Sequence, residues 1–582
     1  MQTNITLSII TGTINRLDGL KEMVNSVRAT VPETMRYEFV IADNGSTDGT
    51  EAWIKEQPDC RLIQLGKPVG GVKALTEAGH AAKGKYSLIS TDDSAFPPYA
   101  IVRAISYLET HTDVGAVCFE DDIEQLKDFD LQTMYNKDGE TFRALYPQVA
   151  LIRTWLGNAC DWWGGRTLMK KAWTYAGDNH LGYQIWMRGY RVVKVPGVTN
   201  IAYYIKDEVS RYQRSVNKQD RKTRESNYGH PRQPFEHCVY PGEPQVENPD
   251  TEELRILFLN DYIRRVPHWR TAKPAFKNAV AECGIVWEHL IKDGDDVPFK
   301  VMQAAGALQP HLILSNIHNN EIFNPEQVRR IRQAAPDAIW LNWIGDVWPK
   351  YHVNPDWAKV WHELDGLLVV NADMIPVCAD HGIKAYYWQS GPEENDGKLD
   401  VAQHDVIFQG NGHRRPNKCG HRAVLYDTLI ELRNEGIDVG IYGENGDDDR
   451  VTGNTFWHFD QTQALNKHAK LVVSDNEFCA SGYTSKRFFD IMYMGGGMIL
   501  HQQTPNFDEL MGIKDGVHYV SWKDYPDLQK KIRYWLKPEN QKRRKAIARN
   551  AKRVCMKKHT YPARMKELLI EVIPQAAKEA KR

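Results

Sequence analysis

The chain has 582 residues and is too long for one hydrophobic core, because a single core rarely grows beyond about 250–300 residues. Its composition, 42% apolar and 26% charged, is that of a globular protein, and a formal net charge of -1 gives no argument for a nucleic acid or a membrane as partner. No apolar run reaches the roughly 18–20 residues that span a bilayer, no export signal is apparent at the N-terminus, and the nine cysteines are scattered singly. We therefore expect roughly three or four folding units with reduced thiols, a cytoplasmic location and no transmembrane segment.

Short apolar runs alternate with helical patterns through the first 240 or so residues. Strand-like runs occupy 5–10, 39–42, 61–65, 86–90 and 114–119. After the first run, leucine and valine recur at helical spacing. This alternation predicts an α/β fold with a mostly parallel sheet covered by helices on both faces.

The strand over 39–42 leads into Asp43, an Asn-Gly turn and a second acidic residue, Asp48. An Asp at the carboxyl end of a parallel strand can accept hydrogen bonds from a base or a ribose. Residues 46–48 can cap the helix that follows. The alternative is an ordinary turn between a strand and a helix, because Asp-Asn-Gly is common turn chemistry.

Three segments follow one another in order: Ser-Ile-Ile-Thr-Gly-Thr-Ile-Asn-Arg over 8–16, the Asp43 turn, and a stretch over 70–94 that ends in Ser-Thr-Asp-Asp-Ser. This succession, over about residues 5–205, resembles the inverting GT-A glycosyltransferases of family 2, which use nucleotide-diphosphate sugars. The resemblance implies a nucleotide-sugar site, UDP-sugar being the favoured donor, with Asp43 at the base. The residues that it places around the donor are Thr13, Asn15, Asp43, Lys73 and Asp92.

Asp92 and Asp93 occupy the place of the D-x-D metal motif of that family. A divalent cation, Mn²⁺ or Mg²⁺, held there would relieve the repulsion between the two phosphates and stabilise the leaving diphosphate. In strict alignment the motif reads Thr91-Asp92-Asp93, so that its first Asp is replaced and Asp93 is the stronger candidate ligand. The departure puts the metal affinity of this module in question. The alternative is a solvated acidic turn.

An inverting transfer also needs a base that takes the proton of the acceptor hydroxyl. The segment over 175–184 looks like the part of the family in which a Glu-Asp pair opens a helix in the acceptor cleft. Asp178 matches the second carboxylate and is the candidate base, while Gly177 replaces the first. The alternative is a helix cap. Trp162 and Trp163 are candidates for stacking on the acceptor, with a core role as the alternative.

A polar, mildly basic and then proline-rich stretch over 206–250 predicts a connector. A second α/β pattern follows, with strand-like runs at 254–259, 311–315, 338–343, 366–370, 385–388, 406–412, 439–442, 471–474 and 498–500. Two Rossmann-like halves, 251–395 and 396–582, are therefore expected, with a nucleotide cleft between them.

The sharpest pattern in the second half is Ser-Gly-Tyr-Thr-Ser-Lys-Arg-Phe-Phe-Asp-Ile-Met-Tyr-Met-Gly-Gly-Gly over 481–497. Small residues at a helix start let backbone N–H groups approach a phosphate. Over about 405–560 the chain is similar to GT-B glycosyltransferases of the CgeB-like kind. This resemblance implies a diphosphate site at Ser485, Lys486 and Arg487, an acidic residue near the ribose at Asp490, and a loop at Gly410 and Gly412 that faces the cleft. It also implies a chain end that crosses back to the first half. No metal is expected in this module, because basic side chains and a helix N-terminus replace it.

His318 and Asp346 are the candidate bases of the GT-B module, and each has a structural role as its alternative. The whole chain is thus predicted to be a bimodular glycosyltransferase with an inverting, metal-assisted GT-A module (1–205) and a metal-independent GT-B module. The alternatives are that only one module catalyses while the other binds a nucleotide sugar or the acceptor, and that the first is a sugar nucleotidyltransferase. A glycan, a protein, a lipid-linked sugar or a modified DNA base are all open as acceptor. A basic C-terminus, over 542–582, faces either solvent or an anionic partner, and the oligomeric state is left open.

Overall fold

The computed structural model shows the protein as two compact units. Unit 1 comprises Met1–Leu257, Ile285–Glu288 and Lys300–Pro310, and unit 2 comprises the rest of the chain. The structure describes residues 5–32, 34–121, 132–135, 141–144, 147–167, 169–170, 172, 177–202, 247–261, 274–291, 296–317, 322–345, 355–394, 396–410, 420–443, 449–453, 459–476 and 479–579. The predicted domain boundaries stay a prediction.

Unit 1 is built on a mixed sheet of eight strands in the order β3-β2-β1-β4-β9-β6-β10-β5. The strands are β1 (Leu7–Thr13), β2 (Tyr37–Asp43), β3 (Cys60–Gln64), β4 (Tyr86–Ile89), β5 (Ser94–Ala95), β6 (Val114–Asp121), β9 (Ala150–Arg153) and β10 (Arg191–Ala202), and β7 (Gln132–Tyr135) pairs separately with β8 (Thr141–Ala144). The pairs from β3 to β4 are parallel, whereas β9 runs antiparallel to both of its neighbours. The predicted α/β fold is confirmed, and β9 makes the sheet mixed.

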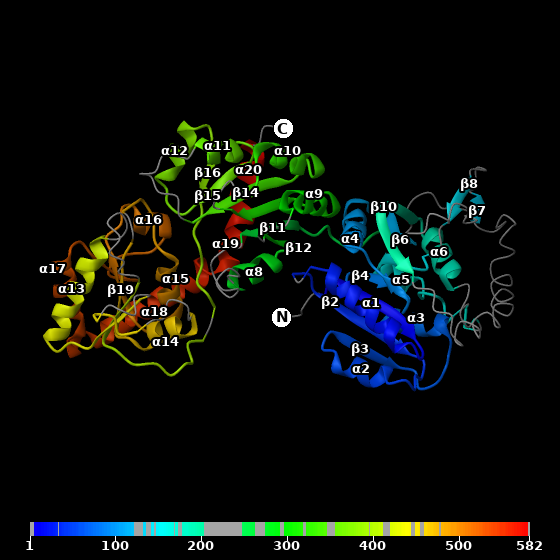
Figure 1. Ribbon diagram of the computed structural model, residues 1–582, viewed down its shortest axis with the longest axis horizontal. Coiled ribbons are helices and arrows are strands. Elements are labelled where there is room, and N and C mark those ends of the chain that lie inside the picture. Colours follow the sequence, from blue (N-terminus) through cyan, green and yellow to red (C-terminus); the bar gives the residue numbers. More distant parts are fainter. Residues whose placement is uncertain are drawn as a thin grey trace. The chain divides into compact units, whose positions relative to one another are not determined.

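In the described part of unit 1, six helices accompany this sheet (Figure 1). They are α1 (Leu17–Thr30), α2 (Thr50–Glu56), α3 (Gly71–Ala81), α4 (Ala100–Thr110), α5 (Thr154–Ala159) and α6 (Gly177–Met187). The central strands are apolar on both faces, as parallel strands covered by helices require, and Ile9, Val40 and Leu88 are fully buried. Helix α3 lies close to β1 because Gly12 has no side chain: a Cβ there would lie 2.9 Å from Cβ of Ala74.

Ion pairs hold the end of the predicted connector and the residues just after it against the sheet of unit 1. Arg153 is buried, and its guanidinium lies 3.4 Å from the carboxylate of Asp250. The Lys85 ammonium lies 2.8 Å from Glu109 and 3.5 Å from Glu253. Because both cations are largely withdrawn from water, losing one partner would leave a buried charge unpaired.

Unit 2 contains the other two sheets, apart from residues 255–257 of β11 and 285–288 of β12, which group with unit 1. The six-stranded sheet has the order β12-β11-β13-β14-β15-β16, and the five-stranded sheet has the order β18-β17-β19-β20-β21. Their strands are β11 (Arg255–Asp261), β12 (Ile285–Ile291), β13 (Leu312–Asn316), β14 (Ile339–Ile344), β15 (Gly366–Val369), β16 (Ala385–Tyr387), β17 (Val406–Gln409), β18 (Val439–Tyr442), β19 (Leu471–Ser474), β20 (Met498–Gln502) and β21 (Val520–Trp522). All nine predicted strands are confirmed. The sequence pattern missed β21, which has only three residues, and β12, an edge strand whose apolar run is interrupted by Glu288 and His289.

Helices flank both of these sheets (Figure 1). They are α8 (Pro274–Ala281), α9 (Val297–Leu308), α10 (Pro325–Ala334), α11 (Pro355–Trp361), α12 (Met374–Asp380), α13 (Gly420–Asn434), α14 (Phe459–His468), α15 (Lys486–Met494), α16 (Phe507–Met511), α17 (Tyr525–Leu536), α18 (Gln541–Lys558), α19 (Tyr561–Glu567) and α20 (Ile573–Glu579). No helix of the described part of the chain is both long and apolar enough to cross a bilayer.

The C-terminal helices of unit 2 return to its first half, as the GT-B resemblance predicted. The red helices α19 and α20 lie among the green elements in Figure 1. The rings of Tyr561 and Phe276 stack at 5.0 Å, and the indole of Trp388 donates to the carbonyl of Arg564 at 3.0 Å. Helix α18, before this crossing, exposes every Lys and Arg that it contains except Arg544.

Candidate functional sites

The first candidate site lies at the carboxyl edge of the unit 1 sheet. Strands β1 and β2 are parallel and in register, so that Thr13 pairs with Asp43 at their last positions. Both residues are nearly buried, at 2% and 1% exposure. The loops after these strands therefore begin side by side, at the edge where open α/β sheets bind ligands.

Hydrogen bonds fix the two loops to each other. Asp43 accepts from the Ser46 hydroxyl at 2.5 Å, and the same hydroxyl oxygen accepts from the backbone N–H of Asn15 at 2.9 Å. The Asn15 side chain accepts from the N–H of Thr47 at 2.7 Å, and its φ of 49° is a left-handed conformation that Asn tolerates. Gly49 occupies the N-cap position of α2, but Asp48 still caps the helix start, because its Oδ1 accepts from the backbone N–H of Thr50 at 3.2 Å. Its Oδ2 accepts from the N–H at the start of α1 at 3.0 Å.

The acidic pair after β4 is paired with an arginine. One carboxylate oxygen of Asp92 accepts from the Thr13 hydroxyl at 2.9 Å, and the other lies 3.1 Å from Nη1 of Arg16. The same Nη1 lies 3.7 Å from the carboxylate of Asp93. Burial raises the pKa of Asp92 to about 6, against the opposing effect of Arg16. The sequence motif gave Asp92 and Asp93, but no pattern assigned Arg16 to them.

The donor set at this edge suits a cation shared with a ligand rather than one held by protein alone. Among the described residues, no group of three or more His, Cys, Asp or Glu side chains could enclose a metal. Asp93 keeps 27% of its side chain exposed, whereas Asp92 keeps 7%. Mg²⁺ in phosphate sites is bound through one or two carboxylates and the substrate phosphates, which is what this pair provides.

The candidate base lies at the predicted helix start. Asp178 is in the first turn of α6 and is partly exposed. Gly177 replaces the first acid of the family pair. The structure explains why a glycine stands there, because a Cβ at this position would lie 2.6 Å from Cε3 of Trp163. The indole of Trp163 thus fills the space that a side chain at position 177 would need.

The tryptophan pair belongs to the core, which corrects its expected place at the acceptor. Trp162 is fully buried and Trp163 is 6% exposed. Trp162 packs against Gly157 and donates to the amide oxygen of Asn158 at 2.8 Å. With no exposed ring face, Trp162 cannot stack on an acceptor from solvent, and the alternative core role is the one observed.

The tryptophan pair begins in a strained turn. Asp161 and Trp162 both have positive φ, 57° and 51°, in a region that costs energy for residues other than glycine. The Asp161 carboxylate contacts the imidazole of His80 at 2.9 Å and accepts from the Thr167 hydroxyl at 2.6 Å. These contacts hold the turn that leads to α6.

Lys73 lies near the start of α3 and is exposed. The loop before it is tied to the Asp43 turn, because the side chain of Asn44 accepts from the N–H of Val69 at 3.1 Å. Gly70, at the N-cap with φ of 88°, lets the chain enter the helix. The loop that leads into the Lys73 helix is thus fastened to the edge that holds Asp43.

The second candidate site lies at the carboxyl edge of the five-stranded sheet in unit 2. Two arginines there share one buried carboxylate: Nε of Arg422 donates to Asp475 at 2.7 Å, and Arg487 lies 3.7 Å from the other oxygen of Asp475. The Arg487 guanidinium also lies over the ring of Phe408, beside Gly410. Burial and the neighbouring Arg422 lower the pKa of Arg487. Among the described residues, two guanidinium groups thus lie around one carboxylate.

Two hydroxyls at the start of α15 add to this second site. Thr484 is 3% exposed, and its hydroxyl oxygen is buried with no hydrogen-bond partner among the described residues. The same holds for the hydroxyl of Ser485, the N-cap of α15, so that this cap makes no side-chain hydrogen bond. A helix N-terminus with spare hydroxyl donors and nearby guanidinium groups suits an anion.

Lys486 and Asp490, which were expected to face a diphosphate and a ribose, form an ion pair with each other. The Lys486 ammonium lies 3.0 Å from both carboxylate oxygens of Asp490 and 3.7 Å from Glu393. Asp490 also accepts from the N–H of Glu393 at 2.9 Å and from Gln463 at 3.1 Å. These contacts join the two halves of unit 2. They favour a structural pair over the predicted diphosphate and ribose roles.

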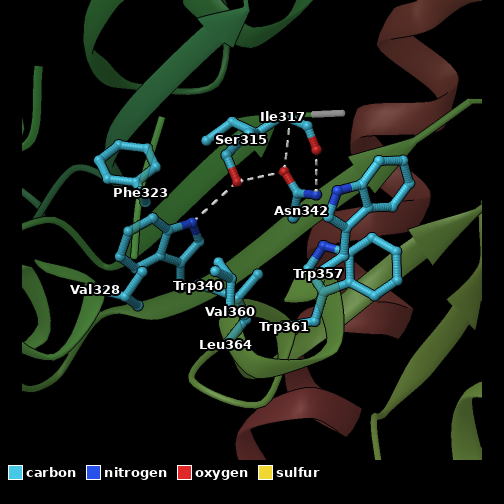
Figure 2. Close-up of a pocket in the computed structure, with 10 residues that line it drawn as sticks. All are labelled: Ser315, Ile317, Phe323, Val328, Trp340, Asn342, Trp357, Val360, Trp361 and Leu364. Carbon is cyan, nitrogen blue, oxygen red and sulfur yellow. Dashed lines mark hydrogen bonds between the residues drawn. The ribbon is translucent and has the colours of Figure 1, made fainter. Parts of the chain in front are cut away.

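Three expected residues, Gly412, His318 and Asp346, lie outside the described residues. The strands before the two candidate bases end at Asn316 and Ile344. Near these strand ends is a hollow of about 380 Å³, including its open part. Figure 2 shows its lining, with polar groups bonded to each other: Asn342 to the backbone of Ile317, and Ser315 to Asn342 and Trp340. The lining residues are Ser315, Ile317, Phe323, Val328, Trp340, Asn342, Trp357, Val360, Trp361 and Leu364.

Two segments of the chain match protein families. Residues 8–176 match the family described as Glycosyl transferase family 2, and residues 422–570 match the family described as Glycosyl transferase-like. The segment toward the N-terminus is therefore similar to family 2 glycosyltransferases, and the segment toward the C-terminus is similar to glycosyltransferase-like proteins. The first match spans the Asp43 edge and the acidic pair, and the second spans Arg422, Asp475 and Arg487. No curated protein matches the chain.

Several solved structures are similar to parts of the chain. TarS 1-349 of S. aureus is 16% identical over 34% of this chain, with a TM-score of 0.29, and the chain spans 60% of that protein. A mannosyltransferase of Pyrobaculum calidifontis, solved with GDP-Man and Mn²⁺, is 22% identical over 37% of this chain and 62% of its own, with a TM-score of 0.28. Alr3699/HepE of Anabaena, solved with UDP and glucose, is 14% identical over 55% of this chain and 99% of its own, with a TM-score of 0.38.

Proposed function

We propose that the chain is a bimodular glycosyltransferase with one nucleotide-sugar site in each unit. The observation that carries this proposal is the placement of Thr13, Asp43 and Asp92 at one sheet edge, inside the segment that matches family 2. The two arginines around Asp475, inside the second matched segment, support the second site.

In the first module, Asp43 contacts the nucleotide and Asp178 acts as base. The acceptor oxygen attacks the anomeric carbon, the bond from that carbon to the diphosphate oxygen breaks, and the nucleoside diphosphate leaves with the electron pair. The acceptor proton passes to Asp178. Because the acceptor attacks in a single displacement on the face opposite the diphosphate, the configuration at the anomeric carbon inverts. Partial exposure of Asp178 leaves its carboxylate accessible for this step.

A divalent cation fits beside Asp93, with Asp92 next to it. When bound, it would neutralise charge on the diphosphate as that group leaves. Asp92 already uses both of its carboxylate oxygens in contacts with Thr13 and Arg16, so Asp93 is the better-placed ligand.

In the second module, Arg487 and Arg422 stabilise the donor diphosphate together with the N-terminus of α15. Their fixed positive charge replaces a metal. Linking the modules raises the effective concentration of a first product at the second site, which favours sequential additions to one acceptor. The alternative, that only one module catalyses, is kept as the second candidate because the first module's Asp92 is already engaged by Arg16.

Replacing Arg487 by Met tests the second site. A charge-assisted hydrogen bond contributes about 1.5–3 kcal/mol, so we expect nucleoside diphosphate to bind unit 2 about 10–150-fold more weakly. Calorimetric titration of the full chain measures this affinity. Arg533→Met is the matched control, because that arginine pairs with Glu435 on the surface of the same unit. Equal affinity in wild type and R487M would remove Arg487 from the donor site.

A further inference from the structure

Arg16 has a position that the proposed reaction does not use. It precedes the first helix of unit 1 and reaches the acidic pair at the end of β4, 76 residues further along the chain. Its Nη1 is within 3.1 Å of Asp92 and 3.7 Å of Asp93, and only 8% of its side chain is exposed. One guanidinium thus contacts both carboxylates of the expected metal motif.

A cation in this place has two physical effects. It offsets the repulsion between the adjacent carboxylates, so the pair stays together without a metal. It also opposes a second cation at the same carboxylates, because like charges a few ångströms apart in a partly buried site repel. Thr13 adds to the first effect by fixing the other oxygen of Asp92.

We propose that Arg16 is a built-in counter-cation of the Asp92–Asp93 pair, and that it lowers the affinity of this site for a divalent cation until a diphosphate is bound. The inference rests on the proposed function of unit 1. It makes Arg16 a positioning residue that sets the order of binding. Without a donor the guanidinium competes for Asp93, and with a donor it gains phosphate oxygens as further acceptors.

Two consequences separate this role from a purely structural one. Removing the charge raises the affinity of the unliganded site for metal, whereas loss of a mere structural contact would lower it by misplacing Asp93. Removing the charge also weakens the coupling between metal and diphosphate, since the coupling of two ligands is reciprocal and part of it acts through Arg16.

Mn²⁺ binding to the full chain, followed by the electron paramagnetic resonance signal of free Mn²⁺, tests the proposal. We expect Arg16→Met to bind Mn²⁺ about tenfold more tightly than wild type in the absence of nucleotide. We expect Arg16→Lys, which keeps the charge, to stay near wild type. Arg28→Met is the matched control, because Arg28 pairs with Asp59 in the same unit and should leave Mn²⁺ affinity unchanged. Asp93→Asn should abolish the binding.

Unchanged or weaker Mn²⁺ binding by Arg16→Met would overturn the proposal, as would the absence of Mn²⁺ binding from every variant. Arg16→Gln provides a second neutral variant if Arg16→Met does not fold, as judged by its thermal unfolding. A parallel titration with UDP and GDP separates the two claims. If Arg16→Met binds Mn²⁺ more tightly but neither nucleotide binds unit 1, only the proposed donor site is refuted. If a nucleotide binds unit 1 but Arg16→Met does not bind Mn²⁺ more tightly than wild type, only the role of Arg16 is refuted.

Discussion

Asp178→Asn is expected to lower the rate of sugar transfer by the first module by about 10²–10⁴-fold, the usual contribution of a positioned general base. The amide cannot take the acceptor proton, yet it keeps the size of the carboxylate in the first turn of α6. Donor affinity should stay unchanged, because the nucleotide is held at the edge around Asp43. Initial rates and nucleotide titrations on the same preparation measure both quantities.

A second carboxylate of unit 1 provides the control for this variant. Asp113 immediately precedes β6, where it forms an exposed ion pair with Arg191. Because the amino end of a parallel strand points away from the ligand edge, Asp113→Asn should transfer sugar at the wild-type rate. If Asp178→Asn kept its full rate, the carboxylate would be a helix cap and the base would have to be sought elsewhere.

Trp162→Ala is expected to destabilise unit 1 by about 3–5 kcal/mol, the range for truncating a large aromatic side chain in a core. The indole is fully buried and packs against two glycines, Gly79 and Gly157, whose missing side chains make room for it. The neighbouring strained turn at Asp161 adds to the loss, because its conformation depends on this packing. Thermal or urea unfolding of the full chain, resolved by unit, measures the change.

Trp53, partly exposed on α2, is the matched control in the same unit. Trp53→Ala should lower the free energy of unfolding clearly less than Trp162→Ala, because less of the Trp53 side chain is withdrawn from water. An acceptor role for Trp162 would be restored if its Ala variant unfolded like wild type and changed only the Michaelis constant for the acceptor.

The strands could be predicted because buried parallel strands leave a strong signal in the sequence. The runs before Thr13 and Asp43 are rich in apolar residues and buried at all but one position each, since helices cover both faces of the sheet. The turn after β2 could also be predicted, because the residues Asp-Asn-Gly-Ser over 43–46 are typical of tight turns. In the edge strand β12, two adjacent polar residues interrupt the apolar run, so the strand gives no comparable signal.

The candidate sites were less accessible to sequence reasoning. A motif names residues that are close along the chain, whereas Arg16 reaches Asp92 across 76 positions and Arg422 reaches Asp475 across 53. A single arginine in a loop or a helix carries no periodic signal. Lys486 shows the opposite case: adjacency to Arg487 suggested a shared ligand, but one step along a helix turns the side chain by about 100°, toward Asp490.

The central claim is that each unit holds one nucleoside diphosphate. Titration calorimetry of the full chain with a panel of nucleoside diphosphates in the presence of Mn²⁺ tests it most directly, in wild type, Asp93→Ala, Arg487→Met and the double variant. We predict two binding events for wild type. In each single variant the event at the altered site weakens while the other keeps its wild-type affinity, and in the double variant both events weaken. Two unaltered binding events in the double variant, or no binding by the folded wild type, would contradict the account.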